Sequence, residues 1–151
     1  MFRGMQEGSV DVKFRLKFPA LVRKRLLEHY DGGDLFITSL DRRDIKIYPL
    51  AEWAKVEARL ADRSGADGIS GQVKNKVQFL ANQNGVEQTL DAQGRVLVPG
   101  RLREALGHSS KLMMQWQGNH IVAVNEALYE QLAIENRLTD AERGDAANLG
   151  M

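Results

Sequence analysis

Two segments of the sequence place an aspartate four residues before an arginine. Asp11 precedes Arg15 in "DVKFR", and Asp91 precedes Arg95 in "DAQGR". The short carboxylate of aspartate can accept hydrogen bonds from backbone N–H groups two or three residues further on, which fixes a turn. The arginine guanidinium suits phosphate oxygens and the O6 and N7 edge of guanine. The spacing therefore predicts two tight turns, each presenting one arginine at its end.

A purely structural explanation competes with this one for either segment taken alone. The aspartate and the arginine are near enough for an ion pair across the end of a hairpin, so both residues could serve only to stabilise the turn. The pattern occurs twice, however, each time followed by alternating apolar residues and a proline. This repetition favours a shared binding role, because two such turns side by side would form a basic ridge, and strands entering a groove are a known way of reading DNA.

Basic and polar residues near the two turns complete the predicted nucleic-acid interface. Lys13 and Lys17 alternate with Arg15, so the three side chains can share one face. We expect Arg15 to be the main DNA contact. The residues expected to assist it are Lys13, Lys17 and Arg3 from the first segment and Arg95 and Gln93 from the second. Asp11 and Asp91 are expected to brace the loops rather than to touch DNA, because a carboxylate repels phosphate.

The similarity between the two segments extends over most of the chain. The matching positions are Asp11 with Asp91, Arg15 with Arg95, Pro19 with Pro99, Arg23 with Arg103 and Leu26 with Leu106. A repeat with only two copies predicts two similar halves around a pseudo-two-fold axis rather than a solenoid. We predict a first half over residues 1–62, a connecting segment with a helix over 63–85, a second half over 86–138, and a flexible tail over 139–151.

Each half is predicted to contain the same elements in the same order. A short strand leads into the Asp-x-x-x-Arg turn, and β-forming residues alternate along the strand that follows. A proline then starts a helix, two further strands follow, and a last helix closes the half. In the first half this closing helix carries Trp53, Val56 and Leu60 at helical spacing. The chain is therefore predicted to be an α+β protein.

The composition narrows the classes of function. The 151 residues include no cysteine, so disulfides and thiolate metal sites are impossible. No apolar run approaches the roughly 20 residues of a membrane helix, and we expect a cytoplasmic protein without a membrane partner. The three histidines lack metal-ligand spacing, and no nucleophile or phosphate-loop motif occurs. We therefore expect no enzyme activity, no metal, no cofactor and no small-molecule substrate.

Charge is distributed unevenly along the chain. The net charge is only +1, but the first 30 residues contain seven basic residues against three acidic ones. A local excess of this kind can be an ordinary solvated surface, or it can attract phosphate. Its coincidence with the first Asp-x-x-x-Arg segment favours the second explanation.

The sequence also resembles a known family, the bacterial MraZ proteins of the AbrB-like swapped-hairpin superfamily. The resemblance covers about residues 1–135 and is carried by "MFRG", "DVKFRLKFP", "YPLAEW" and "DAQGRVLVP". It implies two tandem AbrB-like swapped-hairpin halves that form a pseudo-two-fold β-barrel with flanking helices. The DNA-contacting arginine of the family matches Arg15, and its counterpart in the second half is Arg95.

The same resemblance implies a function. MraZ proteins are transcriptional regulators, typically repressors of their own division and cell-wall gene cluster. They form ring-shaped homo-oligomers and bind repeated promoter boxes in double-stranded DNA. For this chain the resemblance therefore implies a cytoplasmic, nucleoid-associated regulator whose partners are promoter DNA and further copies of itself.

The first motif departs from the family pattern at the residue before its arginine, and also at Lys17 and Phe18, which replace a more uniformly apolar stretch. The family usually has glycine before the arginine, as Gly94 precedes Arg95, whereas this chain has Phe14. Glycine reaches positive φ without a Cβ clash, so a bulky residue is costly there in the same conformation. Either the first turn has another shape, or contacts within the ring or with DNA hold Phe14, or Phe14 packs on a neighbouring residue, which is the outcome we expect.

A protein-binding function is the alternative to DNA binding. Swapped-hairpin proteins include antitoxin-like modules that bind a partner protein through a tail, and a ring could also serve as a scaffold. The tail over 139–151 offers few large side chains for such binding. Salt dependence separates the two functions, because phosphate contacts release counterions and weaken steeply with added salt.

Overall fold

The computed structural model describes residues 1–151, except for the surroundings of Gly32. The elements of the first half are β1 (Gln6–Val10), β2 (Arg15–Lys17), α1 (Ala20–His29), η1 (Asp31–Gly33), β3 (Asp34–Thr38), β4 (Ile45–Pro49) and α2 (Leu50–Ala61). The connecting helix is α3 (Gly71–Gln83). The elements that follow are β5 (Val86–Thr89), β6 (Arg95–Leu97), η2 (Gly100–Leu106), β7 (Lys111–Trp116), β8 (Ile121–Asn125), α4 (Glu126–Glu135) and α5 (Asp140–Asn148). None of the described helices has the length and apolar character that crossing a membrane requires.

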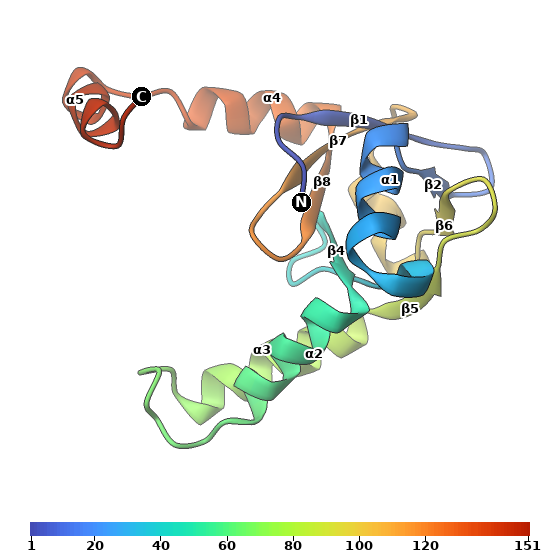
Figure 1. Cartoon of the computed structure of the whole chain (residues 1–151), viewed down its shortest axis with the longest axis horizontal. Coiled ribbons are helices and arrows are strands. Elements are labelled where there is room, and N and C mark those ends of the chain that lie inside the picture. Colours follow the sequence, from blue (N-terminus) through green and yellow to red (C-terminus); the bar gives the residue numbers. More distant parts are fainter.

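The strands form one eight-stranded sheet with the order β5-β3-β4-β8-β7-β1-β2-β6. Neighbouring strands run antiparallel throughout. The two end strands, β5 and β6, contact each other, so the sheet curves into a nearly closed barrel with helices around it (Figure 1). The predicted α+β class and β-barrel with flanking helices are confirmed.

The two halves exchange strands throughout this barrel. β1 pairs with β7 of the other half, and β5, the counterpart of β1, pairs with β3, the counterpart of β7. β2 pairs with its own counterpart β6, and β4 pairs with its own counterpart β8. Because these pairings cross between the halves, neither half has a complete sheet by itself. This exchange is the swapped-hairpin arrangement that the family resemblance implies.

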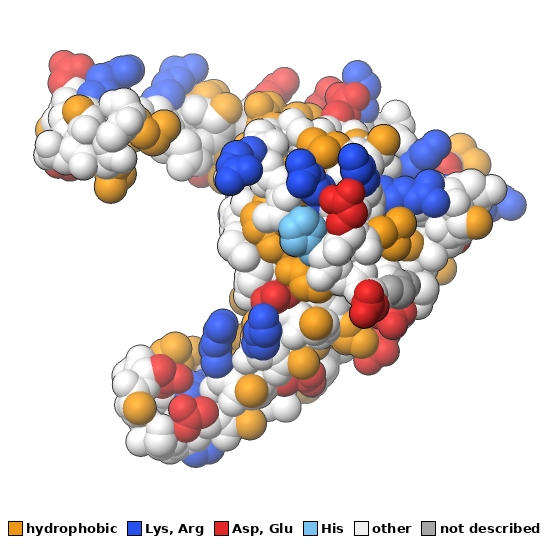
Figure 2. Space-filling view, in the orientation of Figure 1, with side chains coloured by type: hydrophobic (Ala, Val, Ile, Leu, Met, Phe, Trp, Pro, Cys, Tyr) orange, Lys and Arg blue, Asp and Glu red, His pale blue; other side chains and the backbone are white. Residues whose placement is uncertain are grey.

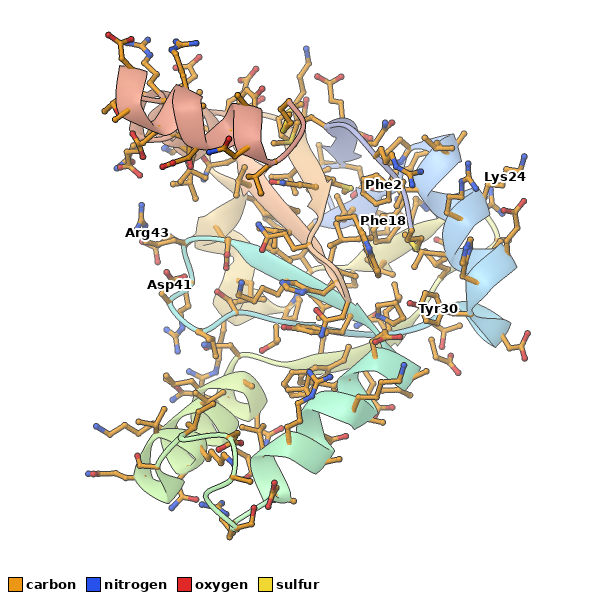
Figure 3. All side chains as sticks on the ribbon, turned by 60° about the vertical axis from the view of Figure 1, so that its left-hand side comes forward. Phe2, Phe18, Lys24, Tyr30, Asp41 and Arg43 are labelled. Atoms are coloured by element: carbon orange, nitrogen blue, oxygen red, sulfur yellow. The ribbon has the colours of Figure 1, made fainter. Side chains whose placement is uncertain are left out.

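Inward-facing apolar residues fill the interior of the barrel. On β2 the middle residue, Leu16, is fully buried, while the residues on either side of it face outward. α1 closes one side of the barrel with Val22 and Leu26. Figure 3 shows Phe2 and Phe18 lying between α1 and the sheet, and both belong to the same buried cluster. The strand that carries Arg15 is therefore anchored through its inner face, which leaves its outer face free.

The helix predicted after Pro99 is a 3-10 helix, whereas its counterpart α1 is an α-helix. η2 buries Leu102, Ala105 and Leu106. The spacing of three between Leu102 and Ala105 places them on one face of a 3-10 helix. Gly100 at the start of η2 also has a poor propensity for the α-helix. The two halves therefore share a topology but differ in this helix.

Two helical arms extend from the barrel, one formed by α2 and α3 and the other by α4 and α5 (Figure 1). α2 is held on the outer face of β3 and β4 by Trp53, whose ring centroid lies 4.5 Å from that of Phe36 and 5.0 Å from that of Tyr48. α5 has no buried residue. Both arms lie on the side of the barrel away from the β1–β2 and β5–β6 connections.

The segment 139–151, for which we predicted a flexible tail, contains the helix α5. Thr139 Oγ1 accepts a hydrogen bond from the backbone N–H of Glu142 at 3.2 Å, and Glu142 Oε1 accepts one from the backbone N–H of Thr139 at 2.9 Å. This capping box satisfies two N–H groups at the start of the helix. Acidic residues in the first turn, Asp140 and Glu142, also interact favourably with the helix dipole.

Candidate nucleic-acid interface

The connection between β1 and β2, residues 11–15, forms a tight turn that we call loop 1. Asp11 Oδ1 accepts hydrogen bonds from the backbone N–H groups of Lys13 at 2.9 Å and Arg15 at 3.0 Å. The other carboxylate oxygen, Oδ2, accepts a hydrogen bond from Arg15 Nε at 2.6 Å. Among the described residues, the two terminal nitrogens of Arg15 have no hydrogen-bond partner. Loop 1 therefore orients Arg15 through Nε and leaves the fork of its guanidinium available.

Loop 2, residues 91–95, repeats this geometry between β5 and β6. Asp91 Oδ1 accepts from the backbone N–H groups of Gln93 at 2.9 Å and Arg95 at 2.8 Å, and Oδ2 accepts from Arg95 Nε at 2.8 Å. Here the guanidinium makes further contacts. Nη2 of Arg95 donates to Gln93 Oε1 at 2.8 Å, and Nη1 lies 4.0 Å from Asp11 Oδ2 of loop 1. Arg95 is thus more fully engaged within the protein than Arg15.

The surroundings of the two aspartates lower the pKa of both carboxyl groups. In Asp11, the hydrogen bond from the backbone of Arg15 is the largest influence and lowers the pKa of the carboxyl below its ordinary value. In Asp91, partial desolvation raises the pKa, but the hydrogen bonds from Arg95 and Gln93 together outweigh it, so that this pKa is also lowered. Charged aspartates are the form that accepts hydrogen bonds from the loop. Both residues therefore make the contacts expected of loop braces.

Loop 1 and loop 2 lie side by side at one edge of the barrel. β2 and β6 pair so that Arg15 lies opposite Leu97 and Lys17 lies opposite Arg95. Two backbone hydrogen bonds extend the pairing, from Phe18 N to the Gly94 carbonyl at 3.1 Å and from Val98 N to the Phe14 carbonyl at 2.9 Å. Figure 2 shows lysine and arginine side chains gathered at the right-hand edge, where Figure 1 places these loops.

Phe14 adopts the same backbone conformation as its counterpart Gly94. The φ angle is 62° at Phe14 and 73° at Gly94, so the first turn does not have another shape. The Arg103 guanidinium carbon lies 4.1 Å from the centroid of the Phe14 ring, which is the packing on a neighbour that we expect. A left-handed conformation costs a non-glycine residue about 1–3 kcal/mol, whereas an exposed cation–π contact contributes about 0.5–1 kcal/mol. The Arg103 contact therefore offsets only part of the cost.

The counterpart of Arg103 covers loop 2 in a different way. Arg23 Nη2 donates a hydrogen bond to the Ala92 carbonyl at 2.8 Å. A Cβ atom built on Gly94 would lie 2.7 Å from Arg23 Cδ, so a side chain at position 94 would displace Arg23. Each loop is thus covered by an arginine from the helix of the other half, although Arg23 and Arg103 were not predicted as site residues. Their equivalent positions in the repeat are the sequence signal that could have identified them.

The outer face of the sheet beside the loops carries a row of polar and basic residues. Ser9 lies opposite Lys111 on one side and opposite Lys17 on the other, and Lys17 in turn lies opposite Arg95. Directly paired residues share a face of the sheet, and Ser9, Lys17 and Lys111 are exposed. Lys111 also lies 3.8 Å from Glu7. Sequence reasoning missed Ser9 and Lys111, because only the pairing of β1 with β7 brings them to this row.

The structure brings most of the predicted site residues together, but not all. Lys13 lies exposed in loop 1, and Gln93 lies exposed in loop 2, where its side chain contacts Arg95. Arg3 precedes β1, whereas loop 1 follows it, so the two are at opposite ends of that strand. Burial, and after it the charge of the nearby Arg3, lowers the pKa of the Met1 amine. Arg3 is therefore separate from the loops.

Comparison with known proteins agrees with this fold. The sequence profile of the family described as "MraZ protein, putative antitoxin-like" matches residues 83–148. The transcriptional regulator MraZ of Acidobacterium capsulatum is 36% identical over 153 residues, which cover 100% of each chain. The chain belongs to the MraZ family. The MraZ proteins of Halorhodospira halophila and Koribacter versatilis are 35% and 33% identical over 133 and 105 residues, covering 87% and 70% of this chain and 84% and 69% of the relatives.

Membership of the MraZ family settles the general class of function. The relatives are named as transcriptional regulators, and this chain covers 100% and 84% of the length of the first two. The family is not one of enzymes. The chain is therefore a transcriptional regulator of the MraZ family.

Proposed function

We propose that this MraZ protein is a sequence-specific DNA-binding regulator that represses its own division and cell-wall gene cluster. The observation that carries the proposal is the position of loop 1 and loop 2, side by side at one edge, each with an arginine held by an aspartate. Arginines oriented in advance lose less conformational freedom on binding than free side chains do. The arrangement thus favours recognition of an anionic, two-fold-related ligand such as duplex DNA.

Arg15 is the main contact in this proposal. Of its guanidinium nitrogens Asp11 binds only Nε, and the terminal fork can donate two hydrogen bonds to O6 and N7 of a guanine or to phosphate oxygens. Lys13 and Lys17 add positive charge beside it. Arg95 and Gln93 contribute less, because they contact each other. Arg3 contributes only at a distance from the loops.

Contacts to the sugar–phosphate backbone of the DNA come from the row on the outer face of the sheet, which runs from Lys111 through Ser9 and Lys17 to Arg95. Its ends are three strand spacings of about 4.8 Å apart, or roughly 14 Å. This distance is comparable with the width of the DNA major groove, about 12 Å. Basic residues at the two ends of the row, Lys111 and Arg95, can therefore meet phosphates on both sides of one groove.

Ring formation completes the proposal. The arms expose apolar side chains, including Phe79 on α3, 65% exposed, and Ile134 on α4, 59% exposed, and exposed apolar surface of this kind is suited to contacts between subunits. A ring would present several loop pairs to repeated promoter boxes and would gain affinity through effective concentration. This gain would allow a chain with a net charge of only +1 to bind tightly at the nucleoid.

A gel-shift titration tests the proposal with duplex DNA from directly upstream of the protein's own gene, across a series of salt concentrations. We expect a shifted complex whose affinity falls steeply with salt. Lys17→Ala and Lys111→Ala should each reduce the slope of log affinity against log salt by about one. Lys76→Ala, an exposed lysine on α3, is the matched control and should leave the slope unchanged.

Failure of the gel-shift test would favour a protein-binding function instead of DNA binding. If the protein fails to shift its own promoter duplex at low salt, or if binding does not depend on salt, the DNA-binding proposal is wrong. The same arms and exposed apolar residues would then support a protein-binding ring scaffold or an antitoxin-like interaction module.

A further inference from the structure

We propose that Phe14 is a specificity-determining residue that contacts the 5-methyl group of a thymine beside the base read by Arg15. The inference deepens the proposed function and rests on it, because it assumes that loop 1 enters a groove of duplex DNA. It assigns a direct role in base recognition to Phe14, whose counterpart in loop 2 is Gly94.

The first observation is the exposure of Phe14 at the end of loop 1. Its side chain is 39% exposed, and it directly precedes Arg15. Arg103 covers one face of the ring at 4.1 Å. A large aromatic ring that is fixed on one side and open to solvent on the other is suited to an apolar contact outside the protein.

The second observation is that the fold does not need a side chain at this position. Loop 2 makes the same turn with Gly94, at nearly the same φ, and with the same pattern of hydrogen bonds from its aspartate. Phe14 therefore holds a left-handed conformation that glycine would adopt without strain, and the contact with Arg103 offsets only part of that cost. Departures from local rules that the fold does not require are concentrated at functional sites.

The chemistry of the major groove identifies the ligand. Thymine presents a methyl group there that cytosine lacks, and phenylalanine is one of the side chains that contact it, while arginine reads guanine. Consecutive residues have Cα atoms about 3.8 Å apart, and base pairs along one strand are about 3.4 Å apart. Phe14 and Arg15 can therefore read neighbouring base pairs, a thymine and a guanine.

The test compares two forms of the promoter duplex from directly upstream of the protein's own gene. One form carries thymine, and the other carries deoxyuridine, which lacks only the methyl group. For the unaltered protein, burial of one methyl group is worth about fourfold in affinity, so we expect about fourfold weaker binding to the deoxyuridine duplex. Phe14→Gly and Phe14→Asn, both of which tolerate positive φ, should bind the two duplexes equally.

Two control variants test whether the preference for thymine depends on the aromatic side chain of Phe14 or on exposed apolar surface in general. Val12→Ala removes a side chain that is 95% exposed in the same loop, and Leu40→Ala removes an apolar side chain that is 38% exposed between β3 and β4. Both should keep the preference for thymine. The inference is overturned if the unaltered protein binds both duplexes equally, if both Phe14 variants keep the preference, or if Val12→Ala abolishes it. Failure to bind either duplex would instead contradict the proposed function itself.

Discussion

Loop 1 and loop 2 have the same backbone but present different chemistry. In both, an aspartate accepts two backbone hydrogen bonds and one from an arginine Nε. Loop 1 adds Phe14 and an arginine with an available fork. Loop 2 has Gly94 under Arg23, and its arginine contacts Gln93. The shape of the turn therefore depends on the aspartate, while the residues between aspartate and arginine determine what each turn offers a ligand.

This difference suggests a division of roles between the halves of a duplicated chain. Arg95 is 24% exposed and approaches Asp11, whereas Arg15 is 34% exposed. Loop 2 thus contacts loop 1 as well as facing outward. A duplicated fold can keep one loop for recognition while the other positions it, because the swapped strands hold both loops in a fixed register.

The largest effect should come from exchanging the two arginines for alanine. Arg15→Ala is expected to weaken binding to the promoter duplex about hundredfold, because a bidentate arginine–guanine pair contributes about 1–3 kcal/mol and a ring would lose several such pairs. Arg95→Ala should weaken binding about tenfold or less, since its guanidinium is already engaged. Fluorescence anisotropy with labelled duplex measures both.

Two results would contradict the assignment of DNA recognition mainly to Arg15 of loop 1. One is a loss for Arg95→Ala as large as that for Arg15→Ala. The other is a clear drop in the thermal unfolding temperature of Arg15→Ala, since partly exposed ion pairs contribute little to stability. Arg15→Lys keeps the charge without the planar fork. Its affinity for the promoter duplex should lie between that of the unaltered protein and that of Arg15→Ala.

The pH dependence of the free energy of unfolding provides a second comparison between the loops and the rest of the barrel. His120, in the turn between β7 and β8, is buried and stacks on Tyr48 with ring centroids 4.4 Å apart. Burial, and after it the charge of Lys46, lowers the pKa of His120 to about 4, although Asp44 opposes this. Within the described residues, His120 Nε2 has no hydrogen-bond partner, so protonation of the folded protein is unfavourable.

The free energy of unfolding should therefore decrease as the pH is lowered from 6.5 to 4. Over this range the unfolded chain binds a proton at His120, with its ordinary pKa of 6.5, and the folded chain does not. The expected loss at pH 4 is about 2–3 kcal/mol. Urea denaturation at several pH values measures it, and His120→Phe, which keeps an aromatic ring without titrating, should remove most of the slope.

The loops should not contribute to this acid sensitivity. The pKa values of Asp11 and Asp91 lie below their ordinary value of 3.8, so the stability they provide is present above pH 3.8 and is lost only as the pH falls further. A slope between pH 6.5 and pH 4 that persists in His120→Phe would show that another group titrates in this range and would contradict the assignment to His120.

The fold and the loops were largely predictable from the sequence, because their signals are local and repeated. The two Asp-x-x-x-Arg segments predict two turns, and the repeat predicts two similar halves around a pseudo-two-fold axis. The exchange of strands between the halves came from the family resemblance. The requirement for positive φ before Arg15 also follows from the comparison of Phe14 with Gly94. The helix after Thr139 was missed although its capping box is visible in "TDAE", because the small, polar composition of the tail outweighed that signal.

Other features depend on long-range register and could not be predicted from local patterns. Lys111 joins the basic row only because β1 pairs with β7. Arg103 reaches Phe14 only because η2 of one half packs beside the loop of the other. The availability of the Arg15 fork depends on which side chains surround it in three dimensions, and spacing along the chain carries no information about that.

The smallest effect, on the free energy of unfolding, should come from substituting the residue that precedes each arginine. Gly94→Ala places a Cβ atom 2.7 Å from Arg23 Cδ at a φ of 73°, and it should lower the free energy of unfolding by about 1–2 kcal/mol. Phe14→Gly should change it by less than about 0.5 kcal/mol, because relief of strain is offset by the lost contact with Arg103 and by the greater freedom of glycine in the unfolded chain.

Urea denaturation of both variants decides whether the aspartates or the neighbouring residues determine the turns. If Phe14→Gly destabilised the protein as much as Gly94→Ala, the ring of Phe14 would be needed to hold loop 1, and its exposure would be a by-product of packing. If only Gly94→Ala is destabilising, Asp11 is sufficient for the turn. Phe14 is then free to serve recognition, since its removal leaves Arg15 in the same position on β2.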